Sequence, residues 1–338
     1  MQETDIFEVL ERAAERRNAR RQFLRFAGAA GVAAALAACD DNDDEPGGTA
    51  TPSPTPTPSP TATATPTPTP TTAQQDIDVL NFALNLEYLE AQFYQYAASG
   101  GGLPSSLTGA TTAPTGSNYS GARGVGFSDQ TVAAYAREIA NDEAQHVAFL
   151  RGALGSSAVN IPAIDIGVGP TTAFSNAARA AGLIAAGATF DPYSSDEFFL
   201  LAAYIFEDVG VTAYKGASPL VTNKTYLEAA AGILAAEAYH AGLIRTVLYR
   251  KGLTTQAQAI SDARDSLDGS DDRDQGITPT GTGATAVSNL VPTDPMGVAY
   301  SRSAGQVLNI VYLNRAAVSM GGFFPAGVNG NLRTSAAS

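Results

Sequence analysis

Two short stretches, Glu143-Ala-Gln-His146 and Glu237-Ala-Tyr-His240, decide how this sequence folds. They contain both histidines of the chain, and each histidine follows a glutamate by three residues. Residues three apart share one face of a helix, so each pair directs a carboxylate and an imidazole toward one point. Two such pairs, with one glutamate from each of two further helices, form the dinuclear metal site of carboxylate-bridged four-helix bundles. Apolar neighbours disfavour the alternative, in which both pairs are solvated on the surface.

Two further glutamates, Glu87 and Glu207, lie in otherwise apolar helical stretches. An unpaired carboxylate is costly in such surroundings, so both are candidate metal ligands. Each is followed seven residues later by a tyrosine, Tyr94 or Tyr214, on the same helix face. These tyrosines are candidates for redox-active groups or for neighbours of the ligands, and core packing is the favoured alternative. Glu90, three residues after Glu87, is an alternative ligand on the first helix.

Two other charged residues accompany these motifs. Asp208 directly follows Glu207, and we expect it to hydrogen-bond a ligating histidine or to be structural. Arg245 could neutralise a nearby carboxylate, but a place on the surface is the favoured expectation.

The rest of the sequence predicts an all-α protein. Helical periodicity and capping residues predict four long helices, over 76–98, 128–154, 194–215 and 223–251. A long crossover, 156–193, with a short helix near 172–183, joins the second helix to the third. This connectivity is typical of ferritin-like four-helix bundles. We therefore expect a bundle over 76–255 and a C-terminal extension, 256–338, that packs on it, with a polar loop over 262–290 and a fifth helix over 301–314.

The first 38 residues resemble an export signal. Arg20 and Arg21 resemble a twin-arginine motif. The apolar stretch 26–38 is shorter than the roughly 20 residues of a transmembrane helix. It ends at Leu36-Ala-Ala-Cys39, which resembles a lipobox. We expect export by the twin-arginine route and a lipid anchor on Cys39, in the periplasm or on the outer face of the cytoplasmic membrane. The alternative is an ordinary signal peptide, with Cys39 uninvolved.

Residues 39–75 are acidic at first and then rich in Thr and Pro. Such a composition cannot bury a core and is typical of an extended spacer. We expect a tether that holds the bundle away from the membrane.

Composition limits the partners and the metal ligands. The net charge of −13 argues against a nucleic-acid partner, which would need a basic face. A single cysteine excludes an internal disulfide framework and a thiolate-rich metal site. Iron, manganese or zinc would have to be held by carboxylates and imidazoles.

Five segments together resemble the ferritin-like domain of desiccation-related proteins. They are residues 80–94, 142–147, 207–214, 237–241 and 321–330. The resemblance covers roughly residues 76–330. By analogy with the ferritin-like superfamily, it implies that Glu143 and Glu237 bridge two metal ions. It implies terminal ligation by Glu87, His146, Glu207 and His240.

A dinuclear site of this kind suits two iron ions, with manganese as the alternative. Oxygen or peroxide would bind between the metals, so ferroxidase or catalase-like chemistry in oxidative or desiccation stress is the first hypothesis. The alternative is a non-enzymatic, metal-binding stress-protection protein of the cell envelope. A homo-oligomer is compatible with the sequence, whereas the anchor and tether disfavour a ferritin-type storage cage.

Overall fold

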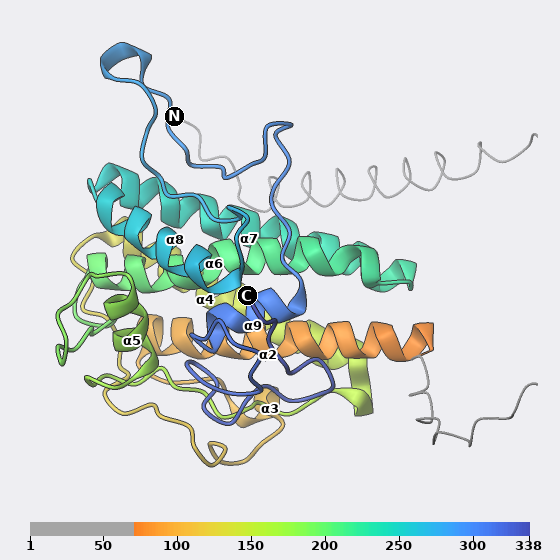
Figure 1. The fold of residues 1–338 in the computed structure, drawn as a ribbon. Helices are drawn as coiled ribbons and strands as arrows, with labels where there is room; N and C mark the ends of the chain where they lie inside the picture. The colour runs from red at the N-terminus through yellow and green to blue at the C-terminus, as the bar shows by residue number, and fades with distance from the viewer. Residues whose placement is uncertain (1–70) are drawn as a thin grey trace, which may run out of the picture. The chain divides into compact units, whose positions relative to one another are not determined.

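The structure is a computed structural model that describes residues 71–338 (Figure 1). The predicted export signal, with Arg20, Arg21 and Cys39, lies outside the described residues, as does most of the predicted tether. Between residues 71 and 338, no helix has both the length and the apolar character needed to cross a membrane.

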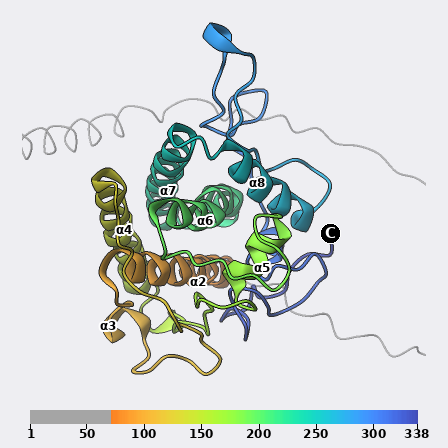
Figure 2. The ribbon, with the colours of Figure 1, turned by 90° about the vertical axis from the view of Figure 1, so that its left-hand side faces the viewer.

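Four long helices form a bundle, and this part of the chain contains no β-strand. The helices are α2 (Thr72–Ser99), α4 (Gln130–Leu154), α6 (Asp196–Ala217) and α7 (Lys224–Arg250). They pack mainly as two pairs, α2 with α4 and α6 with α7, and α2 also contacts α6 (Figure 2). The prediction of an all-α four-helix bundle is therefore confirmed. Helix α2 begins four residues earlier than expected because the Thr71 side chain caps it, accepting a hydrogen bond from the Gln74 N–H.

The helix caps position the two pairs relative to each other. Asp129 caps α4 and Ser195 caps α6, each one residue after the position at which its helix was predicted to begin. Ser128 has another role: its N–H and hydroxyl donate to the buried carboxylate of Asp196, the first residue of α6. This contact ties the start of α4 to the start of α6.

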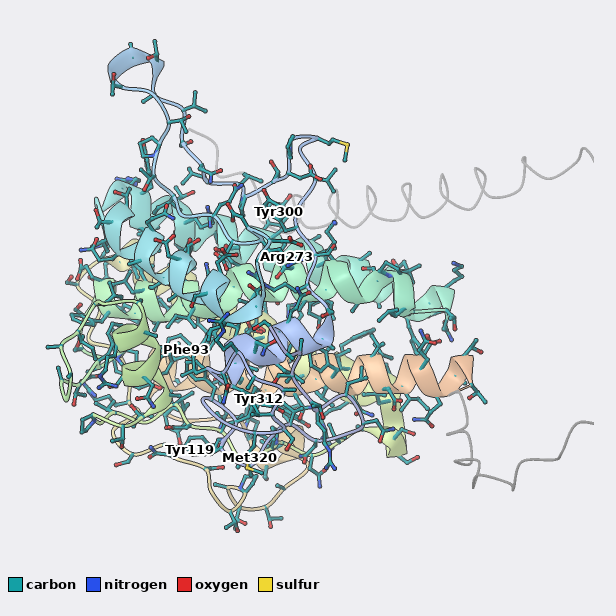
Figure 3. All side chains as sticks on the ribbon, in the orientation of Figure 1. Phe93, Tyr119, Arg273, Tyr300, Tyr312 and Met320 are labelled. Atoms are coloured by element: carbon teal, nitrogen blue, oxygen red, sulfur yellow. The ribbon has the colours of Figure 1, made fainter. Side chains whose placement is uncertain are left out.

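Long connections cover α2, which is buried along most of its length. The first connection contains α3 (Ser105–Thr108), and the crossover between α4 and α6 contains α5 (Ala173–Ala180), close to its expected position. Phe93 of α2 packs against Phe174 of α5, with ring centroids 5.3 Å apart. Phe93 and Tyr312 lie inside the molecule, whereas Tyr119 lies at its lower side in Figure 3.

The C-terminal extension contains one α-helix that the sequence did not lead us to expect. Helix α8 (Thr254–Asp268) occupies part of the stretch predicted as a polar loop. Its buried face includes Arg264 and Asp268, so the usual apolar periodicity is hidden by charge. The expected fifth helix is α9 (Ala304–Val311), which is shorter than predicted. Ser303 and Gln306 form a capping box at its start, and Leu313 has a φ of 54° just after its end.

Three arginines and three aspartates form a buried chain of ion pairs between α6, α7, α8 and the extension. The pairs and their N–O distances are Arg245–Asp208, 2.7 Å; Arg264–Asp208, 3.0 Å; Arg264–Asp274, 2.5 Å; Arg302–Asp274, 3.0 Å; and Arg302–Asp268, 2.6 Å. We call these six residues the ion-pair network. It joins the bundle to its extension by charged contacts, beside apolar ones such as Phe206 against Phe323.

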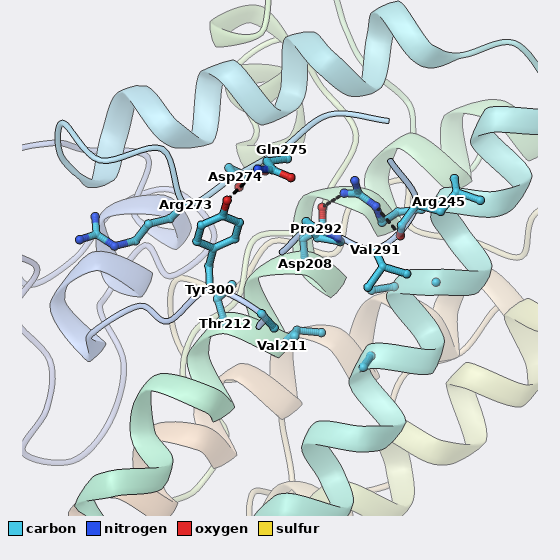
Figure 4. Close-up of a pocket in the computed structure, with 15 residues that line it drawn as sticks. Asp208, Val211, Thr212, Arg245, Arg273, Asp274, Gln275, Val291, Pro292 and Tyr300 are labelled. Carbon is cyan, nitrogen blue, oxygen red and sulfur yellow. Dashed lines mark hydrogen bonds and ion pairs between the residues drawn. The ribbon is translucent and has the colours of Figure 1, made fainter. Parts of the chain in front are cut away.

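This network corrects the expectation for Arg245 and decides between the two alternatives for Asp208. Arg245 does not lie on the surface: it is fully buried and donates to Asp208, to Tyr204 and to backbone carbonyls. Asp208 contacts arginines rather than a histidine and is therefore structural. Figure 4 shows both residues at the edge of a small, mostly apolar cavity of about 90 Å³, with Tyr300 at its other side.

Candidate metal centre

The four long helices bring the six predicted ligands together inside the bundle. Helix α2 supplies Glu87, α6 supplies Glu207, and α4 and α7 supply one Glu-x-x-His pair each. All six are buried, and the most exposed of them, His146, is 9% accessible.

The first group of donors surrounds His146. Its Nδ1 lies 3.2 Å from Glu87 Oε2, 3.5 Å from Glu143 Oε2 and 3.5 Å from Glu237 Oε1. One donor atom from each of these four residues lies within 4.8 Å of all the others. Such a cluster has the size and the donor atoms of a metal site.

A second group of donors adjoins the first and consists of Glu207, Glu237 and His240. His240 Nδ1 lies 3.7 Å from Glu207 Oε2 and 3.1 Å from Glu143 Oε1. Glu237 thus belongs to both groups, and Glu143 lies beside both histidines. From these positions each of the two carboxylates could face two metal ions.

The buried donor atoms are short of partners. Both side-chain oxygens of Glu143 and of Glu237, Oε2 of Glu207 and Nδ1 of His240 are buried and make no hydrogen bond. Buried polar atoms without partners are costly, and clustered carboxylates also repel one another. Metal ions would remove both costs. Oxygen donors with an imidazole at each end suit iron or manganese.

Both predicted tyrosines contact the cluster, each across the bundle. The Tyr94 hydroxyl of α2 donates to Glu207 Oε1 of α6, and the Tyr214 hydroxyl of α6 donates to Glu87 Oε1 of α2. Each bond engages one carboxylate oxygen and leaves Oε2 directed toward a histidine. The tyrosines therefore orient the two outer carboxylates.

The structure adds one residue that the sequence reasoning missed. The carboxylate of Asp142 lies 3.2 Å from His240 Nε2. A proton on Nε2 that is donated to Asp142 leaves Nδ1 free to bind a metal. In the sequence, the indication of this role is that Asp142 directly precedes Glu143. The corresponding residue on α7 is Ala236, so the two histidines are not equivalent.

Glu90 is also buried, but it belongs to neither donor group found in residues 71–338. Its Oε1 and Glu237 Oε2 both approach Gly210 of α6, where a Cβ would lie 3.5 Å and 2.3 Å from them. Of the two candidates on the first helix, Glu87 is therefore the one that lies among the donors.

Without metal ions, several groups of the cluster have pKa values far from their ordinary values. Burial, reinforced by the charge of Glu143, raises the pKa of Glu87 to about 8. Burial also raises the pKa of Glu143, but the nearby imidazoles of His146 and His240 outweigh burial and lower that pKa to about 2. Burial alone would lower the pKa of His240, yet the neighbouring carboxylates raise it to about 10.

The metal-free protein is therefore expected to lose stability as the pH rises from 5 to 8. The pKa of Glu87 is about 8 in the folded state and ordinarily 4.5, so the folded state binds more protons in this window and is favoured at its acidic end. The raised pKa of His240 acts in the same direction above pH 6.5. Thermal unfolding of chelator-treated protein should give a lower Tm at pH 8 than at pH 5. Glu87→Gln should flatten this change, and a Tm that rises with pH would contradict the expectation.

Comparison with known proteins agrees with the fold and the donor cluster. Residues 75–250 match the ferritin-like domain. The ferritin-like catalase Nec2 of Nesocodon mauritianus is 28% identical over 275 residues, which cover 77% of this chain and 85% of the relative. The desiccation-related protein PCC13-62 of Craterostigma plantagineum is 27% identical over 256 residues, which cover 70% and 77%. Since the matched domain spans more than half of its 338 residues, this chain belongs to the ferritin-like domain family.

Proposed function

We propose that this protein binds two metal ions, iron or manganese, and disproportionates hydrogen peroxide. The observation that carries the proposal is the pair of adjoining donor groups that share Glu237 and contain buried oxygens without hydrogen bonds. In this proposal Glu143 and Glu237 would each serve both metals, and Glu87, His146, Glu207 and His240 would be the outer ligands. The two metals would relay two electrons between peroxide molecules: one peroxide is oxidised to oxygen and gives up two electrons and two protons, and these reduce the other to two waters, so that 2 H₂O₂ give 2 H₂O and O₂.

A relative named as a ferritin-like catalase, aligned over 77% of this chain, favours peroxide over ferrous iron as the substrate. The chain's own contribution is to hold the donors and to limit access. Tyr94 and Tyr214 fix the two outer carboxylates through their hydroxyls. The His146 side chain, 11% accessible, is more open than that of His240, so we propose that peroxide arrives on its side of the cluster.

The decisive test is oxygen release from peroxide by the metal-loaded protein, measured with an oxygen electrode. Glu237→Gln should reduce the rate by at least about 100-fold because it removes a charge shared by both metals. Glu228→Gln is the matched control, since Glu228 is exposed on the same helix. Equal rates for Glu237→Gln and wild type would contradict the proposal.

A second function is favoured by the relative named as a desiccation-related protein. Here the metals would serve stability alone, since ions bound only by the native state raise the free energy of unfolding. Protein that holds two metals and loses Tm on chelation, yet releases no oxygen above background, would support this alternative over the first.

We further propose that the protein is exported and anchored by lipid. The support is sequence alone: Arg20 and Arg21 precede a short apolar stretch that ends at Cys39. Metabolic labelling with a radioactive fatty acid in a bacterial host should label the wild type but not Cys39→Ala. Label retained in that variant would contradict the anchor.

A further inference from the structure

A second pocket lies on the covered side of α2, where the first connection folds over it. Its volume is about 260 Å³, and its lining contains none of the six candidate ligands. Gln92 and Tyr96 of α2 form one wall, and Ser105, Thr108 and Tyr119 contribute to the other. The metal centre does not explain this pocket.

The amide of Gln92 gives the pocket a fixed and unused donor. Gln92 is 5% accessible, and its Oε1 accepts a hydrogen bond of 2.5 Å from the Leu103 N–H. Since a backbone N–H can only donate, this bond settles which end of the amide is Nε2. Nε2 donates to no group in residues 71–338, and it is not among the buried atoms sealed from solvent. Gly102 leaves the space that this amide occupies, because a Cβ at that position would lie 2.9 Å from Nε2.

The remaining lining narrows the chemistry of a ligand. Tyr96 and Tyr119 place their rings 5.8 Å apart at an angle of 40°. Ser105, Thr111 and Thr112 add hydroxyl groups, and the lining contains no Asp, Glu, Lys, Arg or His. A charged ligand would find no counter-charge here, and a purely apolar ligand would leave the amide and hydroxyls without partners. A sugar ring offers both hydroxyl groups and an apolar face of C–H groups.

We propose that this pocket binds a neutral sugar, with Gln92 Nε2 donating to a sugar oxygen and a tyrosine ring against the C–H face. The volume is just below the range of about 300–1,000 Å³ that drug-sized ligands occupy, which suits a single ring. The pocket contains none of the candidate metal ligands, so sugar binding and peroxide chemistry can be tested separately.

The test is saturation-transfer NMR and calorimetry on the metal-loaded full chain with D-glucose and N-acetyl-D-glucosamine. At least one sugar should bind saturably, with a Kd on the order of 1 mM. Gluconate serves as the charged probe and cyclohexanol as the apolar probe, and neither should compete. If neither sugar binds saturably, water alone fills the pocket and the proposal is overturned. Competition by gluconate or cyclohexanol would show that the pocket has a different chemistry and would also overturn it.

The residue-level test is Gln92→Glu. This change keeps an acceptor for the Leu103 N–H and so preserves the fold, but it removes the free donor and adds a charge. Sugar binding should weaken about tenfold or more, with metal content unchanged. Gln74→Glu is the matched control, because Gln74 is exposed on the same helix. Equal sugar binding by Gln92→Glu and Gln74→Glu would contradict the assignment of Gln92.

Discussion

Replacing Arg302 with alanine is expected to lower the free energy of unfolding by about 3–5 kcal/mol. Arg302 is 1% accessible and donates through Nε to Asp268, through Nη2 to Asp274 and through Nη1 to Thr212. Without Arg302, the buried carboxylates of Asp268 and Asp274 each lose an ion pair and a hydrogen bond. Asp268 Oδ1 already makes no hydrogen bond. The large effect comes from leaving charged carboxylates buried without a partner. The net stabilisation by the ion pairs themselves is smaller.

Urea unfolding at constant metal saturation measures this effect through the midpoint, with the slope checked for two-state behaviour. Arg273→Ala is the matched control. Arg273 lies in the same segment, but it pairs with Asp271, whose side chain is 72% accessible. Exposed pairs of this kind contribute about 0–1 kcal/mol. If Arg302→Ala and Arg273→Ala had similar urea midpoints, the buried ion pairs would contribute no more to stability than an exposed pair, which would contradict the prediction.

The ion-pair network also shows where prediction from the sequence stops. The four bundle helices and the six donors were predictable because their signals are local: a helical period and a glutamate three residues before each histidine. Arg264 and Asp208 are 56 residues apart, and nothing near either residue indicates the other. The second half of α8, residues 262–268, is therefore predicted as a loop, although Arg264 and Asp268 are paired and buried there.

Other features were hidden for a different reason. The sequence placed Tyr94 and Tyr214 on the faces of Glu87 and Glu207, but in the structure each donates to the glutamate of the opposite helix. A helical period gives the face of a residue and not its partner across the bundle. The role of Gln92 depends on a loop that returns to α2, and no periodicity describes such a loop.

Gly210→Ala is expected to weaken metal binding although it changes no ligand. A Cβ at this position would lie 2.3 Å from Glu237 Oε2, so the shared carboxylate must move. Changes to groups that support metal ligands typically reduce affinity about 10–100-fold, and misplacement by about 1 Å can reduce a rate 100-fold. We therefore expect fewer than the proposed two metals per chain after dialysis and a matching loss of oxygen release.

A control variant separates the loss of metal binding by Gly210→Ala from the general effect of a glycine-to-alanine change in a helix. Gly232→Ala, on α7, is the control, because a Cβ there meets nothing within 4 Å and alanine favours a helix over glycine by about 1 kcal/mol. Its Tm should rise and its metal content should stay unchanged. Glu143→Ala/His240→Ala provides the metal-free reference in the same elemental analysis. If Gly210→Ala retains as much metal as Gly232→Ala, Glu237 is not held where two metals would share it. The bridging role would then have to be abandoned even if the protein contains metal.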